Sequence, residues 1–183
     1  MTPGVAPNAG DVAAGPGVPA IQSTDALGLV RAAVDLAGAD GAGGVAAGVV
    51  DGTGELVAFL RSDGAPLRSI RIAVMKAYTA ARFGRDTAAV ARTLQASGRA
   101  LAEYGDRRFT ALAGGVALVD DRGRIAGGLG ISGRAPEDDH ELAVAAVAGF
   151  RGRVGGSGSA RAAGGTGVDG RLAAVTGARE APR

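Results

Sequence analysis

Lys76 is a candidate functional residue because its charge lies in apolar surroundings. It stands between Met75 and Ala77 in a largely apolar stretch, so its ammonium must reach solvent, pair with a carboxylate or bind a ligand. Asp63 and Asp139 are its candidate partners. A structural ion pair and an anion-binding role both remain open.

His140 is the only histidine of the chain, and it follows three acidic residues, Glu137, Asp138 and Asp139. Acidic side chains at this point match the positive end of a helix dipole, but they could also form an acid/base or metal-binding patch. A single imidazole here is most often a surface residue, and the alternative is a haem iron or metal ligand. The chain has one His and no Cys. This composition excludes thiolate sites and metal sites built from several histidines of one chain.

The segment before these acidic residues carries the pattern GxGxxG at Gly128, Gly130 and Gly133. In a dinucleotide site this pattern opens a helix that receives a pyrophosphate, but here the next helix begins with three acidic residues. We therefore interpret the glycines as positions of close backbone packing. The backbone amides from Gly130 to Gly133, with Ser132 between them, could also contact a ligand.

The elements that must position these residues follow from apolar periodicity and turn residues. Helices are expected at 23–39, 68–83, 86–95 and 136–150. Strands are expected at 45–50, 55–61, 116–119 and 124–131. The strands form two hairpins of similar sequence, which indicates one antiparallel sheet of at least four strands. The fold class is α+β, in the order α-ββ-αα-ββ-α.

Composition divides the chain into a folded unit at 23–150 and two arms that we expect to be disordered. Residues 1–22 are rich in Pro, Gly and Ala, and residues 151–183 are rich in Gly and Arg. Six arginines lie in this second arm, which leaves 14 basic and 16 acidic residues for 1–150, so a specific nucleic-acid interface is not expected. We recognise no signal peptide and no membrane-spanning segment, which makes the cytoplasm the expected location.

Several motifs together resemble the GlcG/HbpS-like family, whose domain also forms the C-terminal part of propanediol-utilisation-type corrinoid adenosyltransferases. The resemblance covers about residues 24–150. Its motifs are Ser62–Ala65, Lys76–Gly84, Gly114–Val116, and Gly127–Gly133 followed by Asp139.

This resemblance implies a profilin-like sandwich, assembly into homo-oligomers and, in several members, binding of haem or a related tetrapyrrole. It also implies, for some members, redox sensing through a partner sensor kinase. The leading hypothesis is therefore an oligomeric ligand-binding protein with haem as the expected ligand. Lys76 and Arg71 would hold anionic groups, and His140, Tyr78 or Met75 would approach the iron. The ligand-binding candidates are Arg71, Lys76, Tyr78, Gly130, Ser132, Gly133 and Asp139.

The rival hypothesis is a cofactor-independent enzyme that acts on a small organic acid or carbonyl metabolite. Lys76 would supply positive charge, Asp63 or Asp139 the acid or base, and the amides of 130–133 an oxyanion site. A third hypothesis is a purely structural subunit without a ligand. Whether the chain is an enzyme stays open at this point.

Overall fold

The computed structural model describes residues 20–120, 122–151 and 161–162. Within them the predicted order α-ββ-αα-ββ-α is confirmed, with element ends shifted by one or two residues. The N-terminal arm and most of the C-terminal arm lie outside the described residues. The helices are α1 (Ser23–Asp40), α2 (Leu67–Phe83), α3 (Thr87–Ser97) and α4 (Pro136–Arg151), with a short 3-10 turn, η1 (Leu101–Tyr104).

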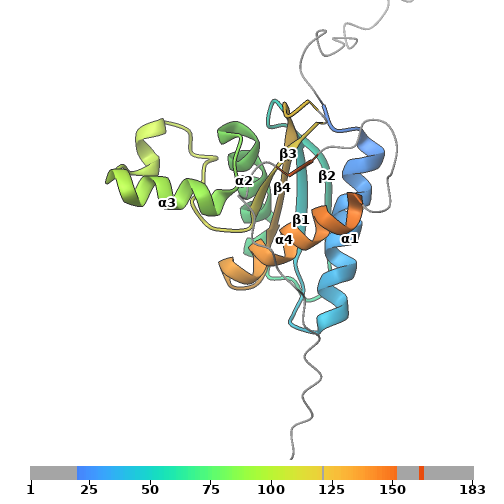
Figure 1. Cartoon of the computed structure of the whole chain (residues 1–183). Coiled ribbons are helices and arrows are strands. Elements are labelled where there is room, and N and C mark those ends of the chain that lie inside the picture. The colour runs from blue at the N-terminus through green and yellow to red at the C-terminus, as the bar shows by residue number, and fades with distance from the viewer. Residues whose placement is uncertain (1–19, 121, 152–160, 163–183) are drawn as a thin grey trace, which may run out of the picture.

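The strands form one antiparallel sheet in the order β2-β1-β4-β3-β5 (Figure 1). They are β1 (Ala46–Asp51), β2 (Leu56–Arg61), β3 (Gly115–Val119), β4 (Ile125–Ser132) and β5 (Arg161–Ala162). The two predicted hairpins are β1-β2 and β3-β4, and they join through β1 and β4, where Ala46 pairs with Ser132 and Asp51 with Gly127. The two-residue β5 pairs with β3 and lies in the segment expected as a tail.

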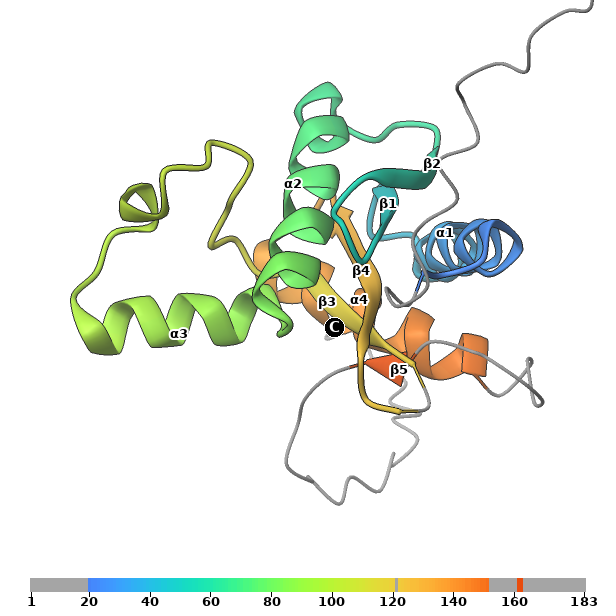
Figure 2. The same ribbon diagram turned by 90° about the horizontal axis from the view of Figure 1, so that it is seen from above.

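The helices cover both faces of this sheet (Figure 2). On one face α1 and α4 pack against each other and enclose the main core with Val49, Leu129 and Ile131. On the other face α2 lies along β4, with Ala77 and Ala81 against Val50. The segment from α3 through η1 extends sideways from the α2 face (Figures 1 and 2). No helix among the described residues is long and apolar enough to span a membrane.

Helix α2 can lie this close to β4 because the strand presents glycines to it. A Cβ built on Gly130 would come within 2.1 Å of the Ala73 carbonyl oxygen, and one on Gly128 within 2.2 Å of that of Ala77. Any side chain at these positions would push the helix off the sheet. The interpretation of the GxGxxG pattern as backbone packing is therefore the one that fits at Gly128 and Gly130.

We expect Gly130→Ala to lower the free energy of unfolding by about 3 kcal/mol or more, because overpacking against a backbone carbonyl cannot be relieved by a rotamer change. The matched control is Gly38→Ala in α1, where a Cβ would meet nothing within 4 Å. That control should be neutral or stabilising by up to about 1 kcal/mol. Urea unfolding monitored by circular dichroism measures both, and equal effects would contradict this account of the helix–sheet contact.

Candidate functional site

Lys76 is directed from α2 past the end of β4 and into the protein, where its side chain is 2% exposed. Its Nζ donates to the Ile131 carbonyl oxygen at 2.9 Å and to Asp139 Oδ2 at 2.7 Å. Of the two partners expected for Lys76, the structure therefore brings Asp139 to it. Asp63 is exposed and lines a separate cavity of about 510 Å³ beside α1.

Asp139 belongs to the first turn of α4, and its side chain is 1% exposed. While Oδ2 accepts from Lys76, Oδ1 accepts from the backbone N–H of Arg134 at 3.1 Å. The carboxylate thus fixes both the start of α4 and the end of the lysine side chain. Of the three consecutive acidic residues, Asp139 is the one that the helix turns inward, whereas Glu137 and Asp138 are exposed.

Burial is the main influence on the ionisation of this pair. Desolvation lowers the pKa of Lys76 and raises the pKa of Asp139, and in each case the hydrogen bond to the partner acts in the opposite direction. Each charge is therefore tolerated because the other is present.

Gly114 lies against the pair on the side of the segment before β3. Its φ is +117°, and a Cβ there would lie 2.7 Å from Lys76 Nζ and 2.9 Å from Asp139 Cβ. Both the backbone conformation and the space require glycine. The end of the lysine side chain is thus surrounded by α2, β4, α4 and the segment before β3, and it also lines a small cavity.

The predicted site residues fall into several groups. Lys76, Ser132, Gly133 and Asp139 line one cavity of about 140 Å³. Gly130 lies beneath α2. Arg71 lines a different cavity of about 610 Å³ formed with residues of the 101–109 segment. Since Arg71 and Lys76 are five residues apart on one helix, they point about 140° apart around its axis.

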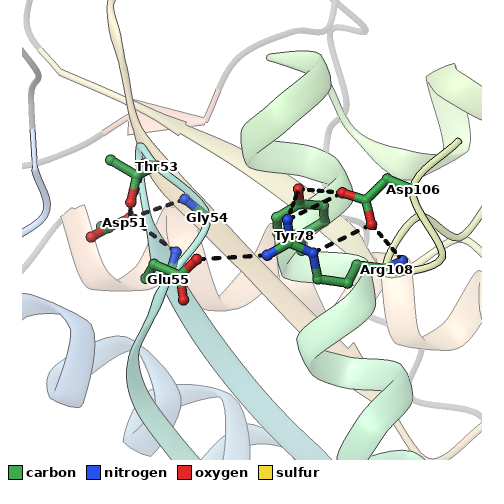
Figure 3. Close-up of polar contacts among 7 residues, drawn as sticks. All are labelled: Asp51, Thr53, Gly54, Glu55, Tyr78, Asp106 and Arg108. Atoms are coloured by element: carbon green, nitrogen blue, oxygen red, sulfur yellow. Dashed lines mark hydrogen bonds and ion pairs between the residues drawn. The ribbon is translucent and has the colours of Figure 1, made fainter. Parts of the chain in front are cut away.

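Tyr78 takes part in a third arrangement (Figure 3). Its hydroxyl donates to Asp106 Oδ2 at 2.6 Å and accepts from Arg108 at 2.6 Å. The guanidinium of Arg108 lies 4.0 Å from the centre of the Tyr78 ring and pairs with Glu55 at 3.6 Å. The hydrogen bond from the Tyr78 hydroxyl lowers the pKa of Asp106 most, and hydrogen bonds from the backbone and the guanidinium of Arg108 add to this, so that the pKa is about 2. The cluster holds the segment before β3 against α2 and the β1-β2 turn.

His140 lines a cavity of about 510 Å³ between α3, the residues before β3 and α4. Its Nδ1 is buried without a hydrogen-bond partner among the described residues. Burial raises the pKa of nearby Asp86, and the hydrogen bond that Asp86 accepts from the Ala117 N–H acts in the opposite direction. No group of three or more metal-ligating side chains occurs in the described part of the chain. The walls of the cavity are Ala88, Ala91, Arg92, Ala111, Leu112, Ala113, Pro136, Glu137, His140 and Glu141.

The sequence interpretation did not identify Arg68, Arg92, Asp106 or Arg108 as functional candidates. Each is a charged residue in an ordinary surface pattern, and none stands out among the 20 basic and 18 acidic residues of the chain. The sequence does single out Lys76, which is the only lysine, since the other 19 basic residues are arginine.

The structure is an α+β sandwich with separate cavities lined by Arg71, by Lys76 and by His140. A family model described as haem degrading protein HbpS-like matches residues 21–148, and the chain belongs to this HbpS-like family. A comparison with curated proteins finds no match.

Solved structures agree with this assignment. The structure described as the PduOC:heme complex is 33% identical, with a TM-score of 0.64, and the match covers 70% of this chain and 94% of that one. A double mutant of Streptomyces reticuli HbpS is 28% identical, with a TM-score of 0.66 and coverage of 81% and 97%. A further structure of HbpS is 30% identical, with a TM-score of 0.64 and coverage of 70% and 89%.

We expect Lys76→Met to lower the free energy of unfolding at neutral pH by about 3–5 kcal/mol, because it leaves the buried Asp139 carboxylate without its partner. The double variant Lys76→Met/Asp139→Asn removes both charges and keeps an acceptor for the Arg134 N–H, so it should recover part of that loss. Chemical denaturation of the three proteins provides the comparison. A single variant as stable as the wild type would show that the pair is not enclosed as described.

The hydrogen bonds of Asp106 to Tyr78 and Arg108 predict a stability change in acid. The pKa of Asp106 is lowered from 3.8 to about 2 in the folded protein. Its contribution to the free energy of unfolding is therefore complete above pH 3.8 and is lost as the pH falls through about 2. Asp106→Asn should therefore be less stable than the wild type at neutral pH, and the difference should shrink as the pH falls from about 4 to about 2. A difference in melting temperature that stays constant over this range would rule out the proposed ionisation.

Proposed function

We propose that this protein binds haem or a related tetrapyrrole in the cavity between α3 and α4. The observation that carries the proposal is the placement of the only imidazole, His140, in the wall of a cavity of about 510 Å³. Ligand cavities in proteins have volumes of about 300–1,000 Å³ and are mainly apolar with a few polar groups. Membership of the HbpS-like family and the similarity to PduOC, solved as a heme complex, support the same ligand.

The side chains of this cavity fit a tetrapyrrole. Imidazole is a common iron ligand, and because Nδ1 of His140 is enclosed, Nε2 is the atom available to the cavity. Arg92 has no hydrogen-bond partner among the described residues and is suited to a propionate. Small apolar side chains, including Ala88, Ala91 and Ala111, would lie against the flat ring. When bound, haem would supply the ligand-binding and electron-transfer chemistry of its iron.

The remaining candidates have other roles in this proposal. Lys76, the residue first expected to bind a propionate, is held by Asp139 and the Ile131 carbonyl. We therefore propose Arg92 as the propionate partner instead. The hydroxyl of Tyr78 is occupied by Asp106 and Arg108. Arg71 and Phe109 line a separate cavity of about 610 Å³. This cavity is the alternative location for the ligand.

We further propose that the chain assembles with copies of itself. Large apolar side chains are exposed along several elements, among them Leu67 at 75%, Leu27 at 61% and Leu56 at 52%. Contact with a second copy would remove this apolar surface from water. Haem handling, redox sensing and a sensor-kinase partner stay predictions drawn from the family resemblance.

Titration of the full-length protein with haemin tests the proposal. Stoichiometric binding should shift the Soret band, and both His140→Ala and Arg92→Ala should weaken binding by about tenfold or more, equivalent to about 1.4 kcal/mol. Arg31→Ala is the matched control, because Arg31 lies on α1 and pairs with Asp35.

The absence of a Soret shift at stoichiometric haemin would overturn tetrapyrrole binding. A shift that His140→Ala leaves unchanged but Arg71→Ala abolishes would instead place the ligand beside Phe109.

A further inference from the structure

The small cavity at Lys76 lies next to the proposed tetrapyrrole cavity. Leu112 and Pro136 line both, so these two side chains form the wall between them. The small cavity has a volume of about 140 Å³ and is built from the start of α2, the end of β4 and the start of α4. Its apolar lining is Ile72 with Leu112 and Pro136, and the rest of its lining is polar or glycine.

Lys76 has a hydrogen-bond donor to spare in this cavity. An ammonium carries three N–H groups, and the described residues provide two acceptors, the Ile131 carbonyl and Asp139. Since the side chain is 2% exposed, bulk water has little access to the third N–H. A buried ammonium with a third N–H group, in a residue that lines a cavity, favours an additional acceptor there.

The other donors around the cavity favour an anion. Arg68 lies at the start of α2, and no ion pair or hydrogen bond holds its guanidinium among the described residues. The hydroxyl of Ser132 likewise has no partner in the described part of the chain. A planar guanidinium and an ammonium in the lining of one small cavity are suited to the two oxygens of a carboxylate.

The charges of the residues that line the cavity favour a ligand with one negative charge. Lys76 is neutralised by Asp139 at 2.7 Å, and Arg134 is neutralised by Asp40 at 2.7 Å. Arg68 is the remaining cation of the lining. A monoanion would therefore neutralise the cavity, whereas a dianion would leave an uncompensated charge next to the buried Asp139.

The volume limits the size of the ligand. About 140 Å³ corresponds to the space of roughly five water molecules. From these observations we propose that the Lys76 cavity is a second ligand site, which binds a short monocarboxylate of about two or three carbons between Arg68 and Lys76. This inference goes beyond the proposed tetrapyrrole site and does not depend on it.

The test is an NMR titration of the full-length, ¹⁵N-labelled protein without haemin. The probe is sodium acetate, with sodium chloride at equal ionic strength as the reference. We expect saturable shifts of the Ser132 and Gly133 backbone amides with acetate and none with chloride. Sodium benzoate, which is too large for the cavity, should not reproduce the shifts.

Two variants locate the site. Arg68→Ala removes an exposed side chain and should weaken acetate binding about tenfold, since a charge-assisted hydrogen bond is lost. Arg61→Ala, an exposed arginine at the end of β2, should leave acetate binding unchanged.

Three results would overturn the proposal. They are the absence of saturable shifts with acetate, equal shifts with benzoate or chloride, and an Arg68→Ala variant that binds acetate as the wild type does. Each result is independent of haemin binding, so failure here would leave the tetrapyrrole proposal standing.

Discussion

The ion pair between Lys76 and Asp139 is the interaction on which the rest of this structure depends. It joins α2, on one face of the sheet, to α4, which packs with α1 on the other. Removing two charges from water costs several kcal/mol for each ion, so the pair can persist only if its hydrogen bonds are well formed. The Ile131 carbonyl and the Arg134 N–H supply those bonds. The pair therefore ties α2 to the end of β4 and the start of α4, because Lys76 contacts residues 55 and 63 positions further along the chain.

The glycines of the chain make that constraint geometrically feasible. Gly128 and Gly130 allow α2 to approach β4 closely enough for Lys76 to reach the end of the strand. Gly114 provides the space in which the ammonium and the carboxylate meet. As a result, the buried ion pair and two adjacent cavities lie together at the end of β4 and the start of α4. One cavity contains the imidazole of His140, and the other contains the unused donor of Lys76.

The elements could be predicted from the sequence because their signals are local. Apolar periodicity and turn residues define the two hairpins and the helices, and Gly84 ends α2 in the left-handed conformation, as expected for a helix C-terminus. Local sequence patterns could not show whether Asp63 or Asp139 pairs with Lys76, because that depends on how β4 returns beside β1. Arg71 and Lys76 were expected to hold one ligand, and in the structure they line different cavities because they point about 140° apart around α2. Arg92 and Arg68 were missed because an exposed arginine acquires meaning only from the cavity beside it.

The most direct measurement is ¹⁵N NMR of the lysine side chain, because Lys76 is the only lysine and gives a single Nζ signal. We expect a slowly exchanging ammonium signal at neutral pH that shifts when Asp139 is replaced by Asn. A rapidly exchanging signal, typical of a lysine in water and unchanged by that substitution, would show that the buried ion pair does not form.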